Sequence, residues 1–141
     1  NAFIDDVMHH LAPAAKPSEL ELQVNGRKLK LHLYGERVGK ASFAELCEKP
    51  LGAADYLAIA TALEVLVLTD IPTLSAEKRN EAKRFVTLID ALYEHKTKLI
   101  CTAAVPPEKL YPEGDGSFEF ARTVSRLMEM QSKAYAGTAA V

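Results

Sequence analysis

Cysteine is scarce in this chain of 141 residues, which contains only Cys47 and Cys101. Two isolated cysteines are too few for a disulfide scaffold, and they lack the spacing of a zinc site. We expect both to be small buried hydrophobic side chains in a reducing compartment. No secretory signal is visible, and Asn1-Ala2 is interpreted as a cloning remnant at the start of a truncated chain.

The chain also lacks an excess of positive charge and long apolar runs. Lys and Arg number 17 against 19 Asp and Glu, so the formal net charge is −2. This balance excludes the electrostatic pattern of a nucleic-acid-binding module. No apolar run approaches the roughly 18 residues of a membrane-spanning helix. With 48% hydrophobic and 26% charged residues, the composition is that of a globular domain.

Several catalytic motifs are missing. The sequence contains no G-x-x-x-x-G-K-[ST] phosphate loop, no G-x-G-x-x-G, no H-E-x-x-H and no G-x-S-x-G. Each of these chemistries needs a particular backbone cradle or ligand spacing, so none is expected within this chain. The adjacent His9 and His10 would point about 100° apart on a helix and cannot chelate one metal from one face.

The clearest local signal is a β-hairpin. Asn25-Gly26 separates two runs of alternating leucines and polar residues, which predicts a two-residue type I′ turn. The turn would pair Val24 with Arg27, Leu22 with Leu29 and Leu20 with Leu31. All the leucines then fall on one face, as a sheet with one buried face requires.

A βαβ unit is predicted from Val65 to Ala103. Val65–Leu68 and Leu99–Cys101 are short apolar runs typical of buried parallel strands, and a long amphipathic helix capped by Ser75 separates them. The remaining periodicity predicts a helix at 3–11, a linker at 12–18, a turn at 35–40, helices at 42–47 (capped by Ser42) and 53–63, a loop at 112–116 and a helix at 118–134. In that last helix Phe120, Val124, Leu127 and Met128 are expected to face the core.

The predicted fold class is therefore α/β. A mixed sheet combines the parallel βαβ unit with the antiparallel hairpin, and helices flank it. The predicted organisation is an N-terminal helix and linker over 1–18, one α/β domain over 19–136, and a frayed tail over 137–141.

Two places carry candidate functional residues. Asp70 follows a buried strand, where P-loop ATPases hold a Mg²⁺-positioning aspartate, although Ile71 replaces the usual Glu. An ordinary loop role before Pro72 is the alternative, and a small enzyme working near Asp70 and Thr102 is a further one. Arg122 and Arg126 share one face of the last helix and could bind a phosphate or carboxylate, or pair with Glu119 or Glu129.

Blocks throughout the chain resemble the ZapE-like (AFG-one-like) P-loop ATPases of the AAA+ type, and specifically their C-terminal part. The most specific block is Arg-Thr-x-Ser-Arg-Leu-x-Glu-Met, from Arg122 to Met130. The other blocks are Phe43–Cys47, Ala53–Leu57, Ile71-Pro72, Lys83–Phe85, Leu88–Asp90 and Leu92-Tyr93. The family's phosphate loop and its Asp-Glu pair lie upstream and are not in this chain. The order of strand, Asp70, helix, strand, Pro106-Pro107 and Leu110-Tyr111 is either a degenerate echo of that nucleotide core or a convergent βαβ unit.

The resemblance implies an ATPase that uses ATP and Mg²⁺, with no cofactor held by this chain alone. Bacterial members act in cell division on the FtsZ ring, and mitochondrial relatives act in protein quality control at the inner membrane. We therefore expect a fragment that is inactive alone, completes the ATPase body and contacts neighbouring subunits or clients. Its implied partners are its own N-terminal P-loop core, further copies of itself and a protein client such as FtsZ, with no nucleic acid. The implied compartment is the bacterial cytoplasm, or the mitochondrion with peripheral membrane association. Arg122 and Arg126 would sense a neighbouring subunit's nucleotide or fix the domain against the P-loop core. A non-enzymatic protein-binding module is the alternative.

Overall fold

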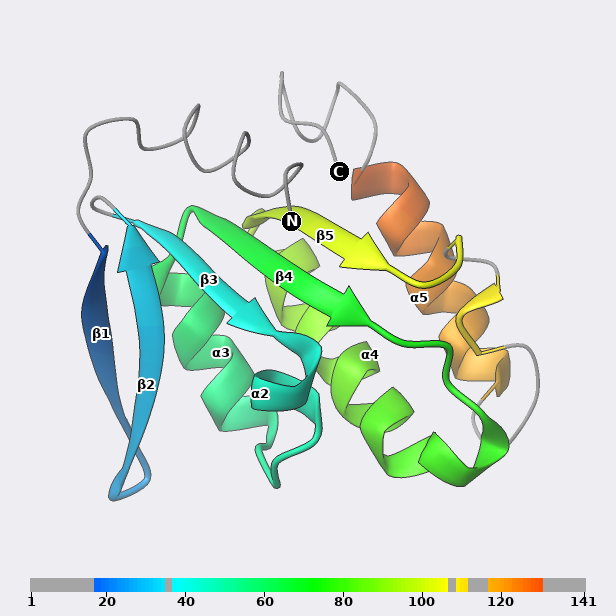
Figure 1. Ribbon diagram of the computed structural model, residues 1–141, viewed down its shortest axis with the longest axis horizontal. Helices are drawn as coiled ribbons and strands as arrows, with labels where there is room; N and C mark the ends of the chain where they lie inside the picture. Colours follow the sequence, from blue (N-terminus) through cyan, green and yellow to red (C-terminus); the bar gives the residue numbers. More distant parts are fainter. Residues whose placement is uncertain (1–16, 35–36, 107–108, 112–116, 131–141) are drawn as a thin grey trace.

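The computed structural model describes residues 17–34, 37–106, 109–111 and 117–130. The predicted helix at 3–11 with His9 and His10, the loop at 112–116 and the tail from 137 lie outside these residues. Within them, five strands form one mixed sheet in the order β1-β2-β3-β4-β5 (Figure 1). This confirms the predicted α/β fold class.

The hairpin formed by β1 (Pro17–Val24) and β2 (Arg27–Tyr34) has the predicted register. Val24 pairs with Arg27, and the leucine pairs follow in step. Asn25 and Gly26 have φ angles of 50° and 80°, the positive values that a type I′ turn requires at both central positions.

The strand β3 (Val38–Ser42) links the hairpin to the parallel strands and corrects the prediction of a turn at 35–40. β3 runs antiparallel to β2 and parallel to β4 (Val65–Ile71). The strand signal of residues 38–42 is weak because its second residue is Gly39, where the close approach of Leu63 leaves no room for a side chain. Tertiary packing therefore overrides weak strand propensity here.

The predicted βαβ unit is confirmed, since β4 pairs in parallel with β5 (Lys98–Ala103). The crossover contains a short 3-10 helix, η1 (Ala76–Lys78), and the long helix α4 (Arg79–Glu94). Ser75 begins the 3-10 helix without a side-chain cap, so the prediction that it caps the long helix is wrong. Ser42, in contrast, caps α2 (Phe43–Cys47) in a reciprocal capping box with Glu45.

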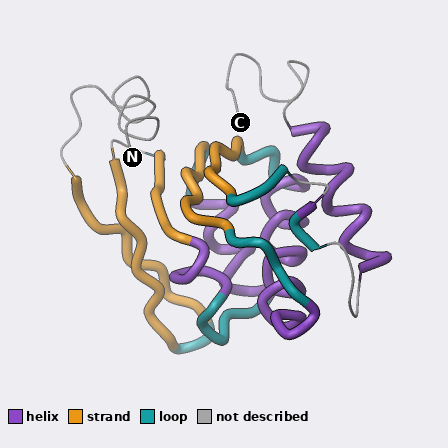
Figure 2. The backbone as a smooth tube through the Cα atoms, turned by 45° about the vertical axis from the view of Figure 1, so that its right-hand side comes forward, coloured by secondary structure: helices purple, strands orange, loops and turns teal. Residues whose placement is uncertain are grey.

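The helices α2, α3 (Ala53–Ala62), α4 and α5 (Ser117–Met130) contribute to one apolar core on a single face of the sheet (Figure 2). The buried stripe of α5 is Phe120, Thr123, Leu127 and Met130. Met128 is exposed, which corrects the predicted inward position of that residue. On the opposite face of the sheet a smaller cluster joins Val65, Val67 and Ile100.

Candidate functional site

Asp70 lies at the carboxyl end of β4, inside an irregularity of the β4–β5 pairing. Its φ angle of 61° is in the left-handed region, which aspartate tolerates better than most residues. Its backbone N–H donates to the Thr102 hydroxyl over 2.9 Å, and its side chain is exposed. The hydrogen bond from Asp70 to Thr102 therefore stabilises the irregular end of β4. This gives both residues a structural role at the carboxyl ends of β4 and β5.

The strand order of the described sheet bears on where a nucleotide could bind. In open α/β sheets ligands bind where the strand order reverses and two loops diverge. Here the order never reverses from β1 to β5. Nowhere in the described part of the chain do three or more His, Cys, Asp or Glu side chains gather as metal ligands would. Among the described residues, Asp70 therefore has no group of neighbouring His, Cys, Asp or Glu side chains with which it could form a metal site.

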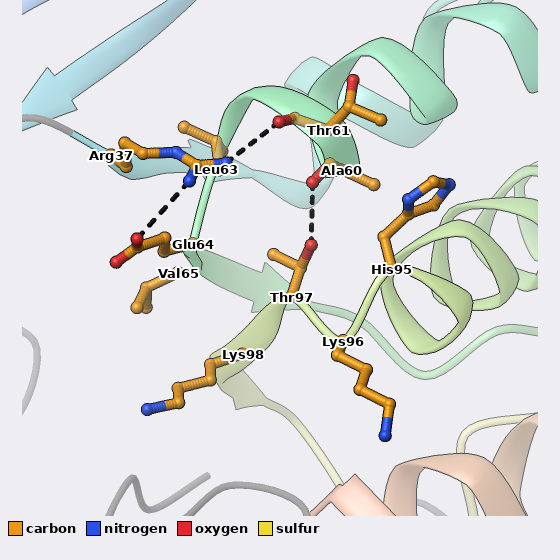
Figure 3. A pocket seen from close by; sticks show the side chains of 10 residues that line it. All are labelled: Arg37, Ala60, Thr61, Leu63, Glu64, Val65, His95, Lys96, Thr97 and Lys98. Carbon is orange, nitrogen blue, oxygen red and sulfur yellow. Dashed lines mark hydrogen bonds and ion pairs between the residues drawn. The ribbon is translucent and has the colours of Figure 1, made fainter.

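A cavity of about 470 Å³ lies at the other end of these strands, beside the amino ends of β4 and β5 (Figure 3). Its polar side chains satisfy the carbonyl groups at the end of α3. The Arg37 guanidinium donates to the Thr61 and Ala62 carbonyls over 3.0 and 3.2 Å, and the buried Thr97 hydroxyl donates to that of Ala60 over 2.9 Å. These bonds cap a helix C-terminus, so the cavity has a structural explanation.

The two predicted arginines meet a carboxylate on another helix. Arg126 bonds to one oxygen of Asp90 on α4, and the Arg122 guanidinium lies 3.5 Å from the other oxygen. In the described residues both arginines pair with Asp90, so the alternative of pairing with Glu119 or Glu129 within α5 is replaced by pairing between α4 and α5. One carboxylate thus serves two guanidinium groups.

Tyr93 adds a second contact to Arg126. The guanidinium lies 4.8 Å from the centre of the Tyr93 ring, a cation–π geometry. A hydrogen bond to Glu129, followed by desolvation and the charge of that carboxylate, raises the pKa of Tyr93. Asp90, Tyr93, Glu129 and the two arginines therefore form one polar cluster along the contact between α4 and α5.

A groove of about 480 Å³ begins beside this cluster. Val86 on α4 is the partly exposed apolar side chain of this groove, Phe120 on α5 lies buried at its base, and Lys83, Glu119 and Arg122 contribute charge. Tyr111 also lines the groove and contacts the Phe120 ring at a centroid distance of 5.3 Å. The arrangement offers a cation beside an apolar surface.

The cysteines are not part of a reactive site. Burial raises the pKa of the Cys47 thiol to about 12 and that of Cys101 to about 11. A thiol that stays protonated at neutral pH is a poor nucleophile and a poor metal ligand. Cys47 is buried as predicted, whereas Cys101 is only partly buried.

Comparison with known proteins identifies the family. A model of the AFG1-like ATPases matches residues 1–139. The chain belongs to the AFG1-like ATPase family. It is 33% identical to the cell division protein ZapE of Escherichia coli strain K12, over 95% of this chain and 36% of that protein. It is 30% identical to the lactation elevated protein 1 homolog B of Danio rerio, over 96% of this chain and 33% of that protein.

The chain thus spans about a third of the length of these two AFG1-like relatives. No solved structure matches it. Across the residues described, no helix is long and apolar enough to cross a membrane.

The sequence of this AFG1-like chain placed Asp90 and Tyr93 in blocks that resemble the family, but it gave neither of them a role in a site. Both lie on α4 at the border between its buried and exposed faces, with intermediate burial. A helical pattern places them beside each other, one turn apart. Nothing in that pattern states that α5 packs alongside, so the pairing required the tertiary structure.

Proposed function

We propose that this chain is the C-terminal part of an AFG1-like ATPase and holds no nucleotide itself. It would complete the body of an ATPase whose ATP and Mg²⁺ are bound by the P-loop core, and it would contact neighbouring subunits or a protein client. Cell division or protein quality control is the proposed setting, in the bacterial cytoplasm or the mitochondrion. The support comes from the family match over residues 1–139, together with a described sheet whose strand order does not reverse.

The α4–α5 cluster is the proposed contact with the rest of the ATPase. Its two guanidinium groups share one carboxylate, and Arg122 keeps 59% of its side chain exposed. An exposed guanidinium presents several donors in a plane and suits a carboxylate on an adjoining surface. We therefore place Arg122 and Arg126 in docking against the P-loop core. Direct sensing of a neighbouring nucleotide is the competing role.

The test is ATP turnover by the full-length protein. Arg122→Gln should lower turnover by at least about tenfold, which corresponds to about 1.4 kcal/mol in the barrier. The KM for ATP should stay unchanged if the arginine acts in docking. A raised KM for ATP would favour nucleotide sensing instead. The 141-residue chain on its own should show no turnover above buffer.

Lys30→Gln is a matched control. Lys30 has a similar exposure of 57% and a similar ion-pair distance of 3.7 Å to Glu19, but it lies on the hairpin far along the sheet from α5. Losing its charge should leave turnover unchanged. Wild-type turnover and client handling in the Arg122→Gln, Arg126→Gln double variant would remove the functional assignment.

A non-enzymatic protein-binding module is the second candidate. The groove between α4 and α5 favours it, because the partly exposed Val86 lies there beside the charged Arg122. Under this reading the 141-residue chain alone would bind a client as tightly as the full-length protein does, and nucleotide would not change that affinity.

A further inference from the structure

The two arginines at the α4–α5 contact are held unequally. Arg126 has two partners, the Asp90 carboxylate and the Tyr93 ring, and only 23% of its side chain is exposed. Arg122 has one recorded partner, the other Asp90 oxygen at 3.5 Å, and its side chain is 59% exposed. The cluster therefore fixes Arg126 firmly and Arg122 loosely.

The charged side chains near Arg126 also differ from those near Arg122. Glu129 bonds to Tyr93 and acts on the same phenol as Arg126, so a second carboxylate lies near Arg126. Lys83 and Glu119, which carry opposite charges, line the neighbouring groove together with Arg122. Arg122 is left to share a carboxylate that already bonds to Arg126. Of the two cations, Arg122 is therefore the more exposed and the more loosely paired.

We propose that Asp90 is a positioning residue that gives the two arginines different roles. It secures Arg126 as the group that holds α5 against α4. It also keeps Arg122 at the surface of the contact, with donors free for a carboxylate of the adjoining ATPase body. Without Asp90 the two guanidinium groups, one turn apart on α5, would repel each other and lose their common orientation. This inference rests on the proposed docking function.

Hydrogen exchange of α5 amides in the full-length protein tests the division directly, whatever the function. Arg126→Gln and Asp90→Asn should each accelerate exchange in α5 by about tenfold, because the helix loses its anchor. Arg122→Gln should change α5 exchange by no more than about twofold, as expected for a largely exposed, loosely paired group. Equal acceleration by Arg122→Gln and Arg126→Gln would overturn the proposal, and so would unchanged exchange in Asp90→Asn.

Turnover of the same variants tests whether Asp90 acts through Arg122. Asp90→Asn should lower kcat with the KM for ATP unchanged, and Asp90→Glu should restore most of the loss because it returns the carboxylate. The Asp90→Asn substitution should lower turnover by a smaller factor in the Arg122→Gln background than in the wild-type protein. An undiminished further loss would overturn the positioning role. If exchange divides as stated but Arg122→Gln keeps full turnover, the docking function fails and only the anchoring of α5 by Asp90 and Arg126 stands.

Discussion

Replacing Gly39 by alanine tests why β3 can occupy the middle of the sheet. A Cβ atom at this position would lie 2.6 Å from Leu63 Cδ1 and 3.0 Å from Leu63 Cδ2. Leu63 is buried in the main core and has little room to move. Overpacking of this kind costs about 1–3 kcal/mol of folding free energy. We expect Gly39→Ala to lower the free energy of unfolding by that amount.

A second substitution shows whether the clash is the cause. Leu63→Ala alone should cost about 2–5 kcal/mol, because it leaves a cavity in the core. In that background the space is open, so Gly39→Ala should be neutral or stabilising by up to about 1 kcal/mol through the reduced entropy of the unfolded chain. Equilibrium urea denaturation followed by circular dichroism measures all four proteins. The same cost for Gly39→Ala in both backgrounds would refute the reasoning.

Three further substitutions or conditions probe other features. Gly26→Val should cost about 1–2 kcal/mol, because the turn holds Gly26 at a φ of 80°, and an unchanged denaturation midpoint would contradict this. Thr123→Val should stabilise the fold by about 1 kcal/mol, since the buried hydroxyl has no hydrogen-bond partner in the described structure, and a lower melting temperature would speak against it. Burial raises the pKa of Cys47 from 9.0 to about 12. The folded state therefore keeps a proton that the unfolded state loses, and stability should fall as pH rises from about 9 to 12. Cys47→Ala should flatten that decline, and an identical slope would exclude the thiol as its source.

Local patterns predicted much of this fold because they carry their own geometry. Asn25-Gly26 between alternating leucines determines both the turn and the register of the hairpin. The apolar run of Val65–Leu68 similarly predicted a strand buried on both faces, and all four residues are buried. In each case a short segment contains the information that its structure requires.

The missed features depend on contacts between distant segments. The strand β3 was not predicted because a glycine at position 39 weakens the local strand signal. The close approach of the distant Leu63 explains why that residue is glycine. The buried face of α5 includes Thr123 and Met130, whereas the sequence predicted Met128. The spacing of apolar residues is compatible with two adjacent faces of this helix, and only the packing against α4 selects one of them. Sequence spacing put Arg122 and Arg126 together but could not supply the carboxylate of Asp90 that joins them.

The order of the strands has a consequence for how the chain folds. In the described sheet every pair of neighbouring strands is also consecutive in the sequence, with β1 and β5 at the two edges. The antiparallel pairs β1–β2 and β2–β3 are joined by short connections, whereas the parallel pairs β3–β4 and β4–β5 are joined through helices, as parallel strands require. A chain synthesised from its N-terminus can add β3 to the finished hairpin, then β4, then β5, each to an edge already in place. No strand has to be inserted between two that have already formed.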